Sequence, residues 1–315
     1  MVSYRPFLNG DVLDLVEIWK NHGPDSALTA DISIDLFERL VLSKPYFDRE
    51  GLIVAVEKNC VAGFVHAGFG PNEEESHLDF HRGVISMLLV HNDCKQQEVA
   101  DELLQRAELY LNDRGAKEIY AAGFGNLCPF YLGLYGGSQL PGILESDTAR
   151  SNLFERNSYQ RNGRILLFRC DLGGFQTRVD RELLRLRRAT QIEYVVEPKS
   201  RSWWDACTQG YLPQLQAIAR PSGGGPEVVS AMLWDMQTLV PPNASRTMGL
   251  SEIRMDDSPQ HRATARYLLL ETFRYLQRQG IGAVQSQAAE EDATTRELLQ
   301  TVGLRDNGFG LILKK

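Results

Sequence analysis

The sequence predicts a mixed α/β protein in which one arrangement of strands and helices occurs twice. Short apolar runs rich in β-branched residues alternate with stretches in which apolar residues recur every three or four positions, as expected for strands alternating with helices. A segment of thirty residues from Val90 is also similar, without a gap, to the segment from Met255. At 315 residues the chain is longer than one hydrophobic core usually supports, which favours two domains.

The first half begins with two amphipathic helices, expected at residues 11–22 and 32–43. Apolar strands bounded by polar or glycine-containing turns follow, and we expect them at residues 51–57, 61–69, 84–90 and 118–125. The first two strands are joined by a turn at Lys58–Asn59, and the last two are separated by a helix at residues 99–114. A polar loop is expected at residues 70–83.

The second half repeats this strand–helix–strand order at an offset of 165 residues. Six of the thirty compared positions are identical, and they are Ala100, Leu103, Leu104, Tyr110, Leu111 and Gly115, which match Ala265, Leu268, Leu269, Tyr275, Leu276 and Gly280. We place the domain boundary after the apolar strand 164–172, where a glycine pair and a charged, helix-prone connector begin, so the domains are 1–172 and 173–315. The alternative is that two unrelated strand–helix–strand units look alike at this level.

Both copies have a strand that ends at a polar turn and leads into a helix. The free N–H groups and the positive end of such a helix bind anions, and pyrophosphate is a common one. In the first copy the junction carries Val90, Lys95, Glu98 and Ala100 in order. In the second copy the same spacing holds Met255, Gln260, Ala263 and Ala265.

This spacing resembles the acetyl-CoA motif of the Gcn5-related N-acetyltransferase (GNAT) family, in which a strand ending in Val precedes basic-x-x-Gly-x-Gly/Ala at the start of a helix. The resemblance implies two tandem GNAT-like domains similar to mycothiol synthase, each with a mixed, largely antiparallel sheet flanked by helices and a V-shaped cleft for acetyl-CoA. The residues that it assigns to acetyl-CoA are Val90, Lys95, Gln96, Gln97, Glu98, Val99 and Ala100 in the first copy, and Met255, Gln260, His261, Arg262, Ala263, Thr264 and Ala265 in the second.

Both copies depart from the family motif at its central glycine. The first copy has Glu98 there, and a carboxylate near a phosphate costs about 1 kcal/mol or more. The second copy has Ala263, and the neighbouring His261 and Arg262 add donors and positive charge. The sequence therefore favours the C-terminal half as the better acetyl-CoA site. The alternative for Glu98 is that it points to solvent on the first helical turn, where acidic residues are common.

The resemblance also implies a tyrosine that protonates the departing thiolate, but Phe154 and Leu299 stand at the aligned positions. Tyr131 and Tyr135, in a glycine-rich segment that is expected to lie near the acetyl end of the first cleft, are the replacement candidates. The alternative is that they only pack this loop. Glu252 is the candidate base of the second copy, with an exposed strand glutamate as the alternative.

Composition argues against several other classes of protein. The net charge of −7 gives no support to a nucleic-acid or membrane surface, and no stretch approaches the ~20 apolar residues of a membrane span. The five cysteines are widely spaced, which fits a reducing cytoplasm. A metal site is not expected, because His77, Asp79 and His81 lack the spacing of a zinc helix and lie in the polar loop. An oligomer is possible but nothing implies one.

We therefore expect a cytoplasmic enzyme that transfers an acetyl group from acetyl-CoA to an amine, with one of the two copies degenerate. The amine is not specified by the sequence. The alternative is a protein that has lost catalysis in both copies and serves as a CoA sensor or a protein-interaction module.

Overall fold

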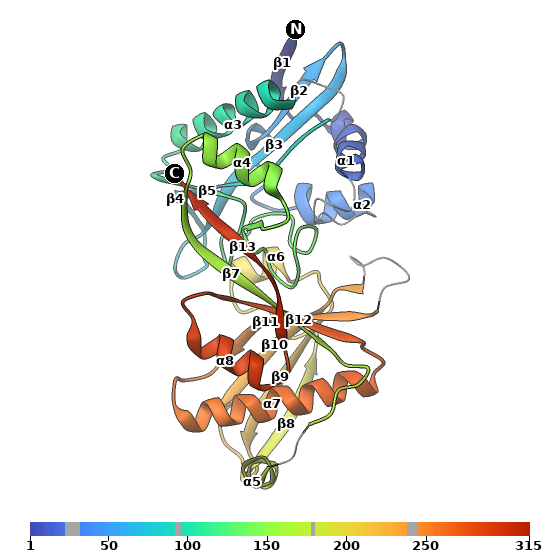
Figure 1. Ribbon diagram of the computed structural model, residues 1–315, viewed down its shortest axis with the longest axis vertical. Coiled ribbons are helices and arrows are strands. Elements are labelled where there is room, and N and C mark those ends of the chain that lie inside the picture. Colours follow the sequence, from blue (N-terminus) through green and yellow to red (C-terminus); the bar gives the residue numbers. More distant parts are fainter. Residues whose placement is uncertain (23–31, 92–95, 178–179, 238–244) are drawn as a thin grey trace.

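The computed structural model describes residues 1–22, 32–91, 96–177, 180–237 and 245–315, and these form one continuous sheet with helices packed against it (Figure 1). The sheet has thirteen strands, in the order β1-β2-β3-β4-β5-β13-β7-β12-β11-β10-β9-β8, with β6 attached to β13. The N-terminal half occupies the upper part of Figure 1 and the C-terminal half the lower part. The predicted mixed α/β class is confirmed.

The N-terminal half contributes four antiparallel strands and one parallel strand. These are β1 (Val2–Pro6), β2 (Leu52–Glu57), β3 (Cys60–Pro71), β4 (Leu78–Val90) and β5 (Glu118–Ala121), the last of which runs parallel to β4. The turn between β2 and β3 has positive φ at both Lys58 and Asn59, the geometry of a tight hairpin turn. Strand β5 ends earlier than expected because Ala122 adopts a φ of 62°.

The polar loop predicted at residues 70–83 is shorter in the structure. Strand β3 continues to Pro71 and β4 already starts at Leu78, so only residues 72–77 connect them. Several of the added strand residues are partly or fully exposed, which explains why their sequence lacks the apolar alternation of a half-buried strand.

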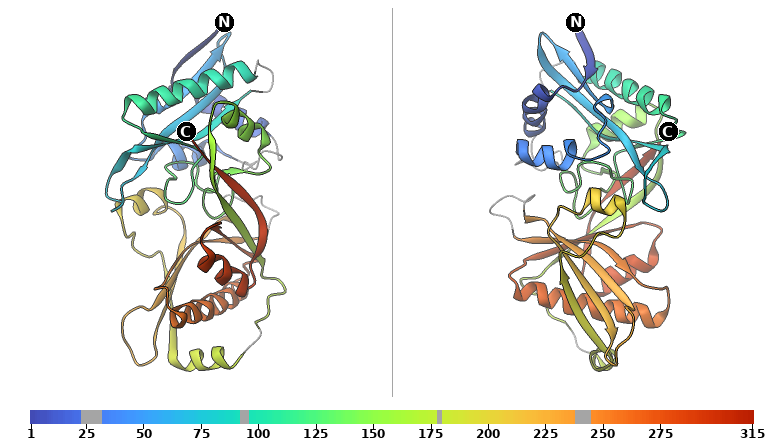
Figure 2. Two further views of the ribbon diagram at one scale, coloured as in Figure 1. Left: turned by 60° about the vertical axis from the view of Figure 1, so that its left-hand side comes forward. Right: turned by 180° about the vertical axis from the view of Figure 1, so that it is seen from behind.

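Helices cover both faces of the N-terminal sheet (Figure 2). The helices are α1 (Val12–Asn21), α2 (Ile34–Phe37), α3 (Gln96–Asp113) and α4 (Thr148–Arg156). Buried side chains of α3 and α4 share one core with β2–β5, whereas those of α1 and α2 share a second core with the segment 128–144. The helix predicted at 32–43 is divided, since α2 gives way to a π-helical turn at Glu38–Leu42.

The C-terminal half repeats this plan. Its strands are β8 (Thr190–Val196), β9 (Gln214–Pro221), β10 (Val229–Asp235), β11 (Thr247–Arg254) and β12 (Ala283–Ala289), and only β11 and β12 are parallel to each other. Its helices are α5 (Arg181–Ala189), α6 (Trp203–Thr208), α7 (Pro259–Arg278) and α8 (Ala293–Thr301). The matched Gly115 and Gly280 follow α3 and α7 with φ of 103° and 79°, a backbone conformation that favours glycine. The internal repeat is therefore present in the fold.

The two halves exchange their last strands. Strands β7 (Gln160–Asp171) and β13 (Arg305–Lys314) pair with each other, yet β13 also pairs with β5 of the N-terminal half and β7 with β12 of the C-terminal half. The short strand β6 (Ile143–Leu144) adds to β13. The C-terminus consequently lies among N-terminal elements (Figure 1), where the backbone of Lys315 bonds that of Ile119. The domain boundary after residue 172 stays a prediction.

Candidate active site

The candidate site begins where β4 and β5 separate. They pair from Arg82 with Glu118 to Ile85 with Ala121, and the last contact is the Ala122 N–H to the Ile85 carbonyl at 2.9 Å. Strand β4 then continues to Val90 without β5 beside it. Parallel strands that separate in this way expose backbone groups and leave room for a ligand between them.

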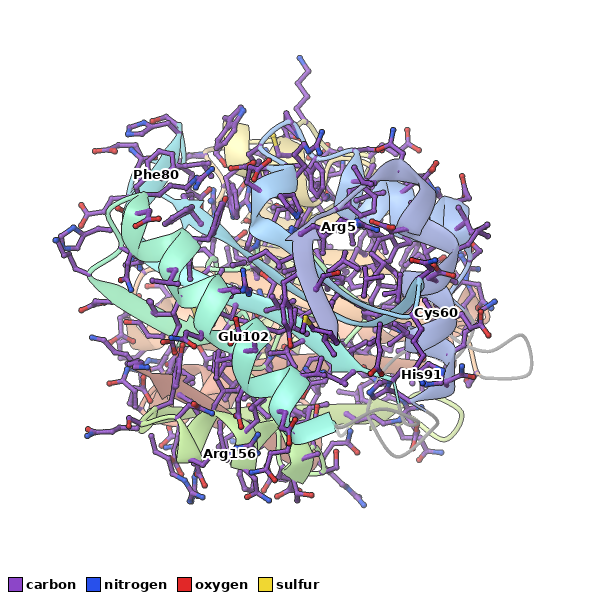
Figure 3. The ribbon with its side chains drawn as sticks, turned by 90° about the horizontal axis from the view of Figure 1, so that it is seen from above. Arg5, Cys60, Phe80, His91, Glu102 and Arg156 are labelled. Atoms are coloured by element: carbon purple, nitrogen blue, oxygen red, sulfur yellow. The ribbon has the colours of Figure 1, made fainter. Side chains whose placement is uncertain are left out.

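A cavity of about 390 Å³ opens beside the free end of β4. We call this cavity the N-terminal cleft. Its walls are formed by Leu88–Val90 of β4, His22 after α1, Gln97 and Ala100 of α3, and residues of the α4 side from Asp147 to Arg156. Figure 3 looks down on this half and shows α3 crossing it, with Glu102 on the helix and Arg156 to one side. Arg156 donates to Asp101 of α3 at 2.8 Å, which links the two helices that flank the cleft.

A cluster of three buried polar side chains lies on the α4 side of the cleft. Asp147 caps α4 by accepting the N–H of Arg150, and it also accepts a hydrogen bond of 3.2 Å from the hydroxyl of Tyr135. The Arg150 guanidinium is 3.5 Å from Asp147 Oδ2 and lies over the ring of Tyr135. Asp147, Arg150 and Tyr135 are each less than a tenth exposed.

His22 supplies an imidazole to the opposite wall. Its Nδ1 is 2.8 Å from the carbonyl of Ile18, and a carbonyl can only accept, so Nδ1 carries the hydrogen. The lone pair of the neutral ring is therefore on Nε2. Burial lowers the pKa of His22 below its ordinary value of 6.5, and the charge of Arg150 acts in the same direction, while the bond to Ile18 opposes them. This histidine is neutral at physiological pH.

The structure brings some of the sequence-predicted residues of the first copy to the cleft and not others. Val90, Gln97 and Ala100 line it, whereas Val99 is buried in the core beneath α3. Glu98 is exposed on the first turn of α3 and is not among the lining residues. Lys95 and the side chain of Gln96 lie outside the described residues.

Tyr131 and Tyr135 are both buried in the segment between β5 and β6. Tyr131 is fully buried against Trp19 and Phe37, its hydroxyl is 3.0 Å from His66 Nδ1, and it does not line the cleft. Tyr135 lies behind Asp147 and accepts the N–H of Leu144 at 2.8 Å. Burial raises the pKa of both phenols, so neither gives up its proton easily.

In the C-terminal half, the chain itself fills the gap between β11 and β12. These strands pair only from Thr247 to Gly249, and residues 136–141 of the N-terminal half enter beyond that point. Gln139 Nε2 donates to the Ser251 carbonyl at 2.5 Å, and Gln287 Nε2 donates to the Leu140 carbonyl at 3.0 Å. A methyl group on Gly249 would lie 2.9 Å from the Ser138 side chain, so the inserted segment is in close contact.

The polar groups at the start of α7 also interact with other residues of the protein. Ser258 caps the helix by accepting the N–H of His261, and Pro259 has no N–H to offer. The His261 ring is 3.5 Å from Asp256, so its donor lies beside a carboxylate. Arg262, the counterpart of Gln97, pairs with Asp257 and reaches Thr294 of α8 at 3.2 Å.

The remaining residues predicted to bind acetyl-CoA in the second copy are either packed against the C-terminal core or exposed to solvent. Ala265 is fully buried, and Thr264 donates its hydroxyl to the Gln260 carbonyl at 2.9 Å. Met255 and Ala263 are partly buried against the C-terminal core, and Gln260 is exposed.

Glu252 lies in a smaller cavity between the halves, together with Arg201 and Arg254. Its carboxylate accepts hydrogen bonds from Arg201 and, at 2.7 Å, from Arg254 Nε. Burial raises the pKa of Glu252, but the two guanidinium groups outweigh it and the net pKa lies below the ordinary value. A carboxylate held in this way is a weak base.

The described residues contain no group of three or more His, Cys, Asp or Glu side chains arranged to hold a metal ion. His77 instead lies 3.0 Å from Ser76, and Asp79 pairs with Arg82. In the same part of the chain, no helix is both long enough and apolar enough to cross a bilayer.

Comparison with known protein families gives a match within the N-terminal half. Residues 17–133 match the model of the acetyltransferase (GNAT) family. This range is therefore similar to a GNAT domain. Its first wall residue, His22, and the β4–α3 junction both fall within the matched range. A search of curated protein sequences finds no match.

Solved structures extend the GNAT fold to the whole chain. One is the GCN5-related glucosamine N-acetyltransferase region of a fungal multi-domain GH3 β-N-acetylglucosaminidase, with a TM-score of 0.72 and 14% identity; the similarity covers 100% of this chain and 38% of the other. A second is a tandem GNAT protein from the clavulanic acid biosynthesis pathway, with a TM-score of 0.64, 12% identity and coverage of 100% and 98%. The tandem arrangement is therefore confirmed. Similarity to mycothiol synthase stays a prediction.

A third similar structure is N-myristoyltransferase from Saccharomyces cerevisiae with bound myristoyl-CoA and inhibitors. Its TM-score is 0.59 at 8% identity, and the similarity covers 99% of this chain and 79% of the other. That protein binds myristoyl-CoA, a long-chain acyl-CoA.

Two residues of the N-terminal cleft were not found from the sequence. His22 follows a helix and has no motif around it, and Arg150 lies in a short helix that shows only a capping aspartate. They come together because the residue after α1 and helix α4, which are more than a hundred residues apart in the sequence, line the same cavity beside the end of β4. The one local signal was Asp147, which has the spacing of a helix cap.

Proposed function

We propose that the N-terminal cleft binds acetyl-CoA and that the protein transfers the acetyl group to an amine. The observation that carries this proposal is an open cavity between α3 and α4 at the separated end of β4, a strand that lies in the range matching the GNAT model. The phosphates of the cofactor lie near the start of α3, where Gln97 and Arg156 line the cleft. The thioester extends along the free edge of β4.

We propose His22 as the general base. The amine must lose a proton to attack the thioester carbonyl, and His22 Nε2 is a neutral acceptor in the same cleft. Within this proposal Tyr135 is a positioning residue, because its hydroxyl holds Asp147 rather than facing the cavity. Tyr131 and Glu252 take no part in the reaction.

We propose that the C-terminal copy no longer binds acetyl-CoA, which reverses the ranking that the sequence favoured. Residues 136–141 cross the gap between β11 and β12. At the start of α7, Asp256 and Asp257 bring negative charge to the place where phosphates would lie. Arg262 bridges to α8 and narrows the space between the two helices.

Two matched substitutions test which cleft is used. Ala149 is exposed on the first turn of α4 and lines the N-terminal cleft, so Ala149→Trp fills the cleft without disturbing the core. Thr294 holds the equivalent place on α8, and Thr294→Trp is the control. Binding is measured as the rise in melting temperature with acetyl-CoA, because a ligand of the folded state stabilises by RT ln(1 + [L]/Kd).

We expect the wild type and Thr294→Trp to be stabilised by millimolar acetyl-CoA and Ala149→Trp to show no shift. The reverse pattern would assign the cofactor to the C-terminal copy, and no shift in the wild type would end the proposal. Release of CoA thiol is then followed with a panel of amines and with longer acyl-CoA molecules. Binding without release by any amine would favour the alternative of a CoA sensor.

A further inference from the structure

Arg150 is a buried cation whose hydrogen bonds are incomplete. Its side chain is 6% exposed, and its Nη2 is 3.2 Å from the sulfur of Met87. Nη1 is buried and has no hydrogen-bond partner among the described residues. Leaving a buried donor unpaired costs about 1–3 kcal/mol, and more for a charged group.

Asp147 does not fully compensate this charge. It is 3.5 Å from the guanidinium, which is longer than a strong charge-assisted hydrogen bond, and its oxygens also accept from Tyr135 and from the backbone of Arg150. A guanidinium group keeps its positive charge inside proteins. The protein therefore keeps a positive charge with a free donor beside a cavity.

Arg150 marks one end of the N-terminal cleft. Its contact with Met87 places it three residues before Val90 on β4, about 10 Å along the strand. The other arginine of α4, Arg156, bonds Asp101 of α3 near the opposite end. A CoA ester with its phosphates at the start of α3 therefore directs its thioester toward Arg150.

We propose that Arg150 is a catalytic residue that binds the sulfur of the acyl-CoA thioester and stabilises the departing thiolate. This inference rests on the proposed function. The amine nitrogen forms a bond to the carbonyl carbon, the C–S bond breaks, and its electron pair leaves on sulfur beside Nη1. An ammonium substrate first loses one proton through His22 to solvent, and the nitrogen loses a second proton to His22 as the C–S bond breaks. The thiolate is later protonated by water or by His22, which yields an amide and free CoA.

This assignment explains how the cleft works without a proton donor on α4. Phe154, four residues after Arg150 on the same face of the helix, has no acidic hydrogen. A cation lowers the free energy of a thiolate by charge, so no proton transfer is needed when the C–S bond breaks.

The pKa of the thiol of bound CoA tests the proposal without a turnover measurement. A free thiol has a pKa of about 8.5, and an opposite charge within hydrogen-bond distance lowers it by about one to three units. We expect the ultraviolet absorbance of the thiolate to titrate at least about one unit lower for CoA bound to the wild type than for free CoA. Arg150→Met should abolish this shift, and Arg150→Lys should keep part of it.

Arg161→Met is the matched control, because Arg161 is exposed, pairs with Glu155 and lies outside the cleft. It should titrate as the wild type does. CoA that lacks the sulfur atom should bind equally to the wild type and to Arg150→Met. Should Arg150→Met fail to fold, the double variant Arg150→Met/Asp147→Asn removes both buried charges and keeps a helix cap.

The outcomes separate this inference from the proposed function. No binding of CoA or acetyl-CoA by the wild type would overturn both. Binding with an unshifted thiol pKa, or a shift that persists in Arg150→Met, would overturn the role of Arg150 and leave the acyl-CoA site in place.

Discussion

His22 and Arg150 respond to burial in opposite ways. The imidazole loses its charge because burial lowers the pKa of His22, whereas the side chain of Arg150 is buried and carries a guanidinium, a group that keeps its charge in proteins. One cleft therefore contains a neutral proton acceptor and a permanent cation. The proposed reaction uses both groups, since the imidazole would take the proton of the amine and the guanidinium would bind the thiolate.

The pH dependence of the rate tests His22 as the base. A base with a lowered pKa is active above that pKa, so the acid limb of kcat/KM should lie below pH 6.5 and the rate should be level at pH 7–8. We expect His22→Gln to reduce kcat by about 10²-fold or more and to remove this limb, with little change in the Kd of acetyl-CoA. A limb that persists in His22→Gln would assign the titration to another group.

His66 gives a separate prediction about stability. It is fully buried, Nε2 has no partner among the described residues, and burial lowers its pKa to about 3. The unfolded state binds the proton near pH 6.5 and the folded state does not, so stability is complete above pH 6.5 and falls as the pH decreases from 6.5 toward 3. The expected slope is at most about 1.4 kcal/mol per pH unit.

Urea unfolding between pH 7.5 and 5 measures this slope. His66→Gln keeps a hydrogen-bonding group for Tyr131 and cannot be protonated in this range, so its stability should depend less on pH. Equal slopes in the two proteins would show that other groups cause the acid sensitivity.

At the scale of elements, helix α3 shows which features can be predicted from the local sequence. Its apolar spacing predicted the helix, and Gly115 predicted its end, because both signals are carried by residues that are neighbours in the chain. The direction of Glu98 did not follow from the motif. Consecutive residues of an α-helix point in directions that differ by about 100° around the helix axis. In the structure Gln97 and Ala100 line the cleft, while Glu98 is exposed and does not line it.

The segment 129–142 marks the limit of such reasoning. Its glycines and aromatic residues predicted a loop near the first cleft, and Tyr135 does lie behind the buried Asp147. Its middle part, however, crosses to the C-terminal half, where Gln139 bonds Ser251. No periodic sequence pattern specifies which residues a loop contacts when they lie more than a hundred positions away. The insertion of residues 136–141 between β11 and β12 was therefore found only in the structure.

The role of Glu98 is tested by Glu98→Gln. Because this side chain is exposed and does not line the cleft, we expect the Kd of acetyl-CoA to change less than about threefold. Loss of a negative charge from the first turn of α3 should lower stability by about 0.3–1 kcal/mol at low salt. Isothermal titration and thermal melting measure the two effects, and much tighter binding would place the carboxylate beside a phosphate.

At the scale of the whole molecule, the exchange of β7 and β13 joins two similar halves into one sheet. Leu313 of β13 is buried in the N-terminal core with α3 and α4, whereas Leu304, just before that strand, is buried in the C-terminal core. The segment from Leu304 to Leu313 therefore contributes to both cores and links the burial of apolar side chains in the two halves.

Leu313→Ala and Leu304→Ala test this linkage. Each should lower the free energy of unfolding by about 2–5 kcal/mol, because each removes a fully buried side chain. Hydrogen exchange should differ between them: Leu313→Ala should increase exchange mainly in α3, and Leu304→Ala mainly in α7. Faster exchange of α7 alone in both variants would show that β13 does not support the N-terminal half.

The pairing of β13 with β5 also sets an order for biosynthesis. The edge of β5 cannot receive β13 until that strand has left the ribosome, which is roughly 10–30 s after the first half at ~5–20 residues per second. The nascent first half therefore presents an unpaired strand edge throughout that interval, when other nascent chains are nearby. We expect its yield in cells to depend on chaperones that shield this edge until β13 is available to pair with it.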